Sequence, residues 1–178
     1  SLKMGKFMSI QINYKSKSSK KSLNNLILFV DEKFNAIQIK RYISRHEYSY
    51  INDLLKTSDV TKKLLVFELN SKRKIILVSI KKKNNFSDIE SLGAELYSRI
   101  NYGKSTSYIL NSDSLSVKQE NLVGYLLHGI KLKSYEFKKY KTKKESRHLI
   151  INVIGKFKPS KSIQLRFDAL EKGTYFTR

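Results

Sequence analysis

The sequence predicts an α/β fold in which helices are layered on a mixed and largely buried sheet. Short apolar runs of strand length alternate along the 178 residues with longer segments whose apolar residues recur every three or four positions. Strands interleaved with helices in this way are typical of layered α/β domains. Hydrophobic residues make up 40% of the chain, enough for a substantial core, and no linker rich in Pro, Gly or Ser divides it. We therefore expect a single domain, 1–178.

The predicted strands are short segments of apolar or alternating character. They span 10–14, 26–30, 64–69, 75–80, 107–110 and 149–154. The second is a continuous apolar run, which suits a central strand covered on both faces. The polar stretch 70–73 predicts a hairpin turn between the third and fourth strands, 16–22 predicts a loop, and Gly155 closes the last strand.

Four segments have helical periodicity. They are 48–56, 88–101, 117–131 and a C-terminal segment that begins after Pro159 and Ser160. Ser87 and Glu90 have the spacing of a capping box at the start of the second helix. The residues expected on the buried faces of the last three helices are, in order, Ile89, Leu92, Leu96 and Ile100, then Leu122, Val123, Leu126, Leu127 and Ile130, and finally Ile163, Phe167 and Leu170.

The net charge of +21 is the most unusual compositional feature. It comes mainly from lysine, and the chain is also rich in Ile, Asn, Ser and Tyr with a single Pro, a composition that a genome rich in A and T would encode. One interpretation is a solvated, compositionally biased surface, and the other is some contribution to anion binding. In both cases we expect non-specific adhesion to nucleic acid at low salt.

No catalytic or metal-binding pattern occurs in the sequence. The chain has no cysteine, no His-Glu-x-x-His, no phosphate-binding Gly-x-x-x-x-Gly-Lys-Ser/Thr loop and no Gly-x-Ser-x-Gly. His46, His128 and His148 are scattered, without a second ligand at metal-binding spacing. His128 lies beside an apolar stripe and is interpreted as a packed histidine, with a ligand or base as the alternative. We assign no catalytic, metal-binding or cofactor-binding residue to this chain.

The N-terminal residues 1–8 lack the apolar stretch and cleavage site of a secretory signal, and we expect them to be a tag remnant or disordered. No run of about 18 apolar residues occurs, so no membrane-spanning helix is expected. Together with the missing cysteines, this predicts a cytoplasmic protein.

Residues 129–144 form a basic segment interleaved with aromatic residues. We expect a helix end here, with the aromatic side chains anchoring the segment to the core and the lysines facing water. Alternatively, the aromatic residues stack on nucleic-acid bases beside phosphate contacts. In that case the residues that contact an anionic partner are Lys138, Lys139, Lys141, Lys143 and Lys144.

The same segment resembles a motif of the leucyl (cytosol) aminopeptidases, Gly-x-x-Leu-x-Ser-Tyr-x-Phe-x-x-Tyr-Lys-Thr. The matching residues are Gly129, Leu132, Ser134, Tyr135, Phe137, Tyr140, Lys141 and Thr142. About thirty residues later that family has a helix ending near Gly-x-x-Phe/Leu-x-Arg, which resembles Gly173, Phe176 and Arg178. The sequence Ser-Leu-Gly-Ala at 91–94 is similar, more weakly, to a Leu-Gly-Gly of the family. The chain thus resembles the N-terminal domain of these enzymes.

This resemblance implies a macro-domain-like, three-layer α/β/α sandwich that performs no peptide chemistry itself. The family's C-terminal catalytic domain, absent from this chain, binds two divalent metals, zinc or manganese, which activate water and stabilise the charge on the scissile carbonyl. The full-length parent is then a homohexameric aminopeptidase, and this chain is its scaffold and oligomerisation domain. Two alternatives stay open, which are a basic nucleic-acid-binding module and a domain that binds an ADP-ribose-type ligand.

Overall fold

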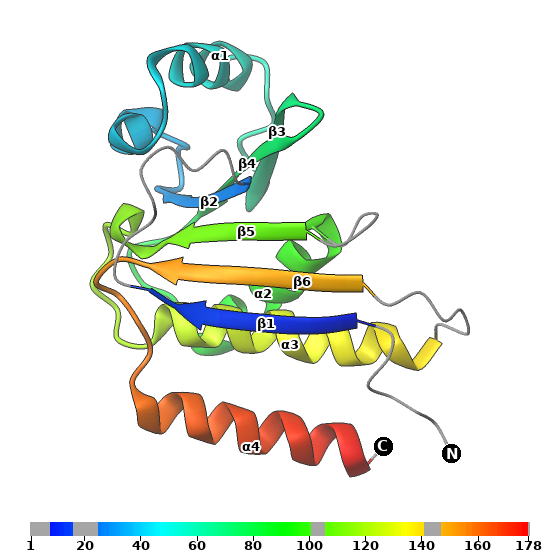
Figure 1. The fold of residues 1–178 in the computed structure, drawn as a ribbon. Coiled ribbons are helices and arrows are strands. Elements are labelled where there is room, and N and C mark those ends of the chain that lie inside the picture. The colour runs from blue at the N-terminus through cyan, green and yellow to red at the C-terminus, as the bar shows by residue number, and fades with distance from the viewer. Residues whose placement is uncertain (1–7, 16–24, 101–105, 141–146, 178) are drawn as a thin grey trace.

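The computed structural model describes residues 8–15, 25–100, 106–140 and 147–177, with the backbone alone at 8–9, 137–140, 147 and 174–177. Its centre is a six-stranded sheet with the order β1-β6-β5-β2-β4-β3 (Figure 1). The strands are β1 (Met8–Tyr14), β2 (Asn25–Val30), β3 (Leu64–Asn70), β4 (Arg73–Ser79), β5 (Thr106–Asn111) and β6 (Arg147–Ile154). The five strands β1, β6, β5, β2 and β4 are neighbours in this order and pair in parallel. β3 pairs antiparallel with β4 at the edge, so the predicted mixed sheet is confirmed.

The helices cover the two faces of the sheet unequally. α2 (Phe86–Ile100) and α3 (Leu122–Tyr140) pack on one face, while the 3-10 helix η2 (Ala36–Tyr42) and α1 (Arg45–Leu55) cover the other (Figure 1). α4 (Lys161–Thr177) lies beside α3 (Figure 1). η2 and α1 lie mainly over β2, β3 and β4. On the same face of the sheet, β1 and β6 carry polar side chains that are exposed or half-buried. These are Gln11, Asn13, His148 and Asn152. The predicted α/β sandwich is confirmed, with one of its outer layers covering only part of the sheet.

β2 is an interior strand, as its unbroken apolar run predicts. Ile27 pairs with Leu110 of β5 on one side and with Ile76 of β4 on the other. Successive side chains of a strand point to opposite faces, so Ile27 and Phe29 enter the core under α2 and α3 while Leu28 enters the core under η2 and α1. A strand buried on both faces needs apolar residues at every position.

The predicted hairpin joins β3 and β4, and an ion pair attaches α1 to it. Arg73 donates from Nε and from Nη2, the latter over 3.2 Å, to the two carboxylate oxygens of Glu47, and its side chain is only 9% exposed. Glu47 also completes a capping box with Ser44, since its backbone N–H donates to Ser44 Oγ and its carboxylate accepts from Ser44 N. One carboxylate therefore starts α1 and holds it against the sheet.

We expect acid to weaken this attachment. Burial tends to raise the pKa of Glu47, but hydrogen bonds from Arg73 and Ser44 outweigh it and lower that pKa below 4.5. A group with a lowered folded-state pKa stabilises the fold above its ordinary pKa, and the stabilisation is lost as the pH falls through the lowered value. Melting temperatures measured from pH 6 down to pH 2 should fall less steeply for Glu47→Gln than for the wild type.

Three helices begin at other residues than the sequence predicts, and the first of them is α1, which begins at Arg45 and not near residue 48. α2 starts at Phe86, capped by Asn85, whose Oδ1 accepts from Asp88 N at 2.8 Å, so the predicted capping box of Ser87 and Glu90 is wrong. The Phe86 ring stacks on Tyr125 of α3, with centroids 3.8 Å apart, and this contact favours the earlier start. α3 starts only after Asn121, whose φ of 63° is left-handed and incompatible with a helix interior.

The length of α3 and the buried face of α4 also differ from the prediction. α3 continues to Tyr140 and does not end near Lys131. Leu170, predicted to be buried, is 47% exposed, and the neighbouring Glu171 is 2% exposed in its place. Among the described residues, η2 was not predicted, because its side chains follow neither a strand nor an α-helical period. No helix in the described part of the chain is both long and apolar enough to cross a membrane.

Candidate functional site

The interface between α3 and α4 contains a buried histidine–carboxylate pair. His128 of α3 and Glu171 of α4 are 5% and 2% exposed, and Nδ1 of the histidine lies 3.1 Å from Oε2 of the carboxylate. An ionised carboxylate only accepts hydrogen bonds, so the ring donates through Nδ1. The Phe167 ring stacks on the imidazole with centroids 4.1 Å apart and fixes its plane. The structure thus places His128 as a packed residue, as the sequence predicts, and gives it a carboxylate partner that the sequence analysis missed.

The other side of Glu171 faces a shared lysine. Lys131 Nζ lies 3.2 Å from Glu171 Oε1 and 3.4 Å from Asp168 Oδ1. Burial tends to lower the pKa of Lys131, but the two carboxylates outweigh it and raise that pKa. Glu171 Oε1 nevertheless accepts no aligned hydrogen bond from any group in the described part of the chain. This oxygen is therefore paired in charge but incompletely satisfied as an acceptor.

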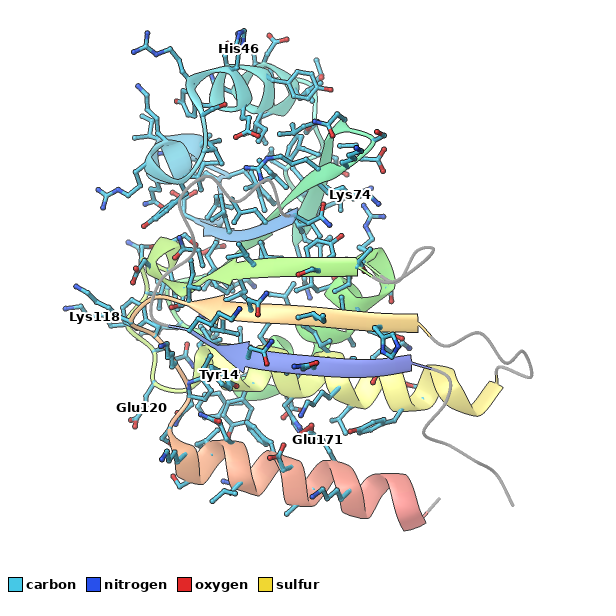
Figure 2. The ribbon with its side chains drawn as sticks, viewed as in Figure 1. Tyr14, His46, Lys74, Lys118, Glu120 and Glu171 are labelled. Atoms are coloured by element: carbon cyan, nitrogen blue, oxygen red, sulfur yellow. The ribbon has the colours of Figure 1, made fainter. Side chains whose placement is uncertain are left out.

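A cavity of about 150 Å³ adjoins the cluster, between α3, α4 and β1. Figure 2 shows Tyr14 at the end of β1 and Glu171 on the side of α4 that faces α3. Both line the cavity together with His128, Lys131 and Asp168. The sequence contained a signal for this arrangement, because Ile163, Phe167 and Glu171 recur at a spacing of four residues, which places them on one helical face. A glutamate was not expected on a buried face because it is rarely buried without a partner.

We expect two tyrosines to titrate late. Burial, reinforced by the negative charges of Asp168 and Glu171, raises the pKa of Tyr14 to about 12, and burial raises the pKa of Tyr108 to about 12. Their protonated forms stabilise the fold fully below pH 10, and this stabilisation is lost as the pH rises through 12. In an alkaline titration followed by phenolate absorbance, Tyr14→Phe and Tyr108→Phe should each remove amplitude from the last phase.

The motif residue Gly129 lies where α2 and α3 approach most closely. A Cβ at Gly129 would overlap the backbone of Glu90, and a Cβ at Gly93 would overlap the carbonyl oxygen of Leu126. At each glycine, the missing side chain thus leaves room for the backbone of the other helix. Gly93 belongs to the Ser-Leu-Gly-Ala sequence at 91–94, so both motif glycines have a packing role.

The other motif residues lie on α3 and α4 or outside the described residues. Ser134 is 1% exposed and donates from Oγ to the Lys131 carbonyl at 2.6 Å, and Tyr135 is half-buried. Gly173 is exposed on α4, with open space around it. Leu132 is half-buried on α3, Phe137 and Tyr140 lie on α3, and Phe176 lies on α4, with no side-chain description of the last three. The motif residues outside the described residues are Lys141, Thr142 and Arg178.

The basic segment is only partly described. Lys138 and Lys139 belong to the last turn of α3, with the backbone alone described, because α3 continues past the predicted end near Lys131 to Tyr140. Lys141, Lys143 and Lys144 lie outside the described residues. The choice between an anchored, solvated segment and an anion-binding one therefore stays a prediction.

The carboxyl ends of β2 and β5 mark the topological switch point of the sheet. The chain leaves β2 toward η2 on one face and leaves β5 toward α3 on the other, and ligands of open α/β sheets commonly bind in such a crevice. Here the 3-10 helix η3 (Ser112–Ser114) occupies the position. Ser112 donates from Oγ to the Ile154 carbonyl at 2.7 Å, and Ser114 Oγ accepts from Phe29 N at 2.8 Å. Two nearly inaccessible serines thus join the strand ends.

A more open and basic pocket lies at the same end of the sheet. It measures about 410 Å³ and lies where α3 and α4 begin. Lys118, Lys156 and Lys158 line it, with Glu120 beside them, and Figure 2 shows Lys118 and Glu120 on the segment before α3. The unpaired N–H groups of helix N-termini and nearby lysines both favour anions. Among the described residues, no group of three or more His, Cys, Asp or Glu side chains is arranged to hold a metal ion.

Comparisons with known proteins relate this chain to others by fold. No family model matches the sequence, and no curated protein matches it. Among solved structures, a tomato leucine aminopeptidase mutant matches with a TM-score of 0.60 and 13% identity, over 93% of this chain and 36% of that chain. The cytosol aminopeptidase of Coxiella burnetii matches with a TM-score of 0.52 and 10% identity, over 91% of this chain and 31% of that chain. The macrodomain of Thermus aquaticus DarG matches with a TM-score of 0.50 and 13% identity, over 83% of this chain and 100% of that chain.

This chain spans about a third of the length of the two aminopeptidases that it matches. At 10–13% identity the similarity concerns the fold alone. The chain therefore has a macro-domain-like α/β fold that a macrodomain and one part of two aminopeptidases share.

Proposed function

We propose that this chain is the non-catalytic N-terminal domain of a two-metal leucyl aminopeptidase, where it positions the catalytic domain and joins subunits. The observation that carries the proposal is the extent of the structural match. More than 90% of this chain aligns with about a third of each aminopeptidase. A domain of a larger peptidase is expected to match in this way.

The packing of the motif residues supports a scaffold role. Gly129 and Gly93 bring α2 and α3 into backbone contact, and Ser134 is buried within α3. η3 fills the crevice at the switch point with Ser112 and Ser114. Among the motif residues whose side chains are described, Gly129, Gly93 and Ser134 thus serve the packing of the domain, as expected of a scaffold, whereas Gly173 is exposed.

The chemistry of the proposed parent belongs to its catalytic domain. Two divalent metal ions, zinc or manganese, would supply the activated water there. We assign no residue of this chain to them and derive no hydrolytic step from it. The proposed parent is a cytoplasmic homohexamer that removes N-terminal amino acids from peptides.

The coding sequence beyond Arg178 tests the proposal most directly. We expect it to continue into Asp-Leu-x-Asn-Glu-Pro and a catalytic domain, and a stop codon there would overturn the assignment. The longer product should hydrolyse a leucyl amide in the presence of Mn²⁺ or Zn²⁺, and purified 1–178 should not. Metal-dependent hydrolysis by 1–178 alone would contradict the non-catalytic role.

Nucleic-acid binding is a second candidate, favoured by the net charge of +21 and by the pocket around Lys118, Lys156 and Lys158. Phosphate contacts make such binding strongly dependent on salt. Gel-shift titrations between 50 and 300 mM NaCl distinguish the possibilities. Sequence preference that persists at 150 mM NaCl would support a dedicated role, and loss of all binding there would leave only non-specific charge.

Binding of an ADP-ribose-type ligand is a third candidate, favoured by the similarity to the DarG macrodomain. The buried serines of η3 leave little room at the switch point, which weighs against it. Calorimetric titration with ADP-ribose is the test. Measurable heat with one-to-one stoichiometry would favour this candidate over the scaffold role, whereas a flat titration would eliminate it.

A further inference from the structure

We propose that the cavity between α3, α4 and β1 binds a small organic ammonium ion. The local charge is the first argument. In a chain with 36 basic and 15 acidic residues, the charged side chains that line this cavity are two carboxylates, Asp168 and Glu171, and one lysine, Lys131. These three side chains together give the cavity one excess formal negative charge inside a strongly positive protein. A single added positive charge would neutralise it.

An incompletely satisfied acceptor is the second argument. Glu171 is 2% exposed, and its Oε1 accepts no aligned hydrogen bond from the described residues, although Lys131 Nζ lies 3.2 Å away. A ligand donor could add an aligned hydrogen bond to this oxygen beside its ion pair with Lys131. The acceptors near it are the half-exposed Asp168 and the phenol oxygen of Tyr14. An ammonium group has several N–H donors and matches this arrangement.

The size and lining of the cavity indicate an organic cation. A volume of about 150 Å³ exceeds that of a bare alkali ion, and in another protein a cavity of this size holds benzene. Phe167 and Ile12 supply apolar surface for an alkyl group. An anion would be repelled by the carboxylates. A primary ammonium with one to three carbons therefore fits better than a phosphate or a metal ion.

Ethylammonium is the probe for this site, used with the full 1–178 chain. We expect the melting temperature in ethylammonium chloride to exceed that in sodium chloride at the same ionic strength, because a ligand that binds only the folded state stabilises it. Asp168→Asn should weaken ethylammonium binding about tenfold, as measured by NMR shifts of the His128 ring, since it removes one charge at a half-exposed position.

Asp53→Asn is the matched control, because Asp53 also pairs with a lysine but lies on exposed α1, away from the cavity. It should leave the binding of ethylammonium unchanged. Equal melting temperatures in the two salts would overturn the proposal, as would equal binding by the two variants. A crystal structure of the protein in ethylammonium chloride with only water in the cavity would also overturn it. None of these outcomes depends on the aminopeptidase assignment, since that assignment is tested on the gene and on hydrolysis.

Discussion

Replacing Gly129 by alanine should destabilise the protein by about 3 kcal/mol, although the same change in an ordinary helix interior is stabilising. The added Cβ would overlap the backbone of Glu90, which no change of rotamer can relieve. α2 and α3 would have to move apart and would lose packing along their shared core. Gly93→Ala should have a similar effect, because its Cβ would meet the Leu126 carbonyl. The free energy of unfolding from urea denaturation is the measurement.

Gly173→Ala is the control for this prediction. Gly173 is an exposed residue of α4, and a Cβ there would meet no atom within 4 Å. The substitution should stabilise the protein by about 0.5–1 kcal/mol through the helix propensity of alanine. The double variant of Gly93 and Gly129 should lose less than the sum of the two single losses, because one separation of the helices relieves both contacts. If Gly129→Ala were as stable as the wild type, the close approach of α2 and α3 would be wrong.

Replacing Glu171 by alanine should cost about 3 kcal/mol of stability. The change removes the carboxylate that pairs with His128. It also removes one of the two carboxylates that pair with Lys131, whose side chain is only 23% exposed, and leaves it the half-exposed Asp168. Breaking a buried ion pair by removing one partner is costly because the remaining charge stays desolvated. We expect α4 to separate from α3 before the rest of the sheet unfolds. Urea denaturation gives the loss in stability, and hydrogen exchange of the α4 amides shows where it occurs.

Asp168→Ala is the corresponding control, since the Asp168 side chain is 50% exposed and its ion pair is accessible to water. It should change the free energy of unfolding by no more than about 1 kcal/mol. Glu171→Gln separates charge from shape, because an amide oxygen still accepts a hydrogen bond from His128. Its loss should lie between those of Asp168→Ala and Glu171→Ala. Equal stability of Glu171→Ala and the wild type would show that the cluster does not hold α4.

Much of the fold could be predicted from periodicity alone. The apolar run of β2 indicated a strand covered on both faces, and Ile27 and Leu28 do enter opposite cores. The stripe that contains Leu92 and Leu96 in α2 is buried as predicted. These predictions hold because side-chain direction follows backbone geometry, with a period of 2 in strands and 3.6 in helices.

The candidate site could not be predicted in the same way. The four-residue spacing of Phe167 and Glu171 places them on one helical face, but a glutamate beside Leu170 would be expected to face solvent. The structure reverses this order, since Glu171 finds His128 and Lys131 on a helix more than thirty residues earlier in the chain. A partner of that kind is visible only once α3 and α4 lie side by side.

The amino-acid sequence by itself determined a mixed α/β sheet with amphipathic helices, a strongly basic composition and a resemblance to part of the aminopeptidases. Those features depend on neighbouring residues and their spacing. The tertiary structure alone decided that α4 turns Phe167 and Glu171 inward and leaves Leu170 in solvent, and that Ser112 and Ser114 close the switch point. The physical reason is that burial of a charge or a hydroxyl depends on a partner from a distant segment, and the choice between two faces of a helix depends on which partner is there.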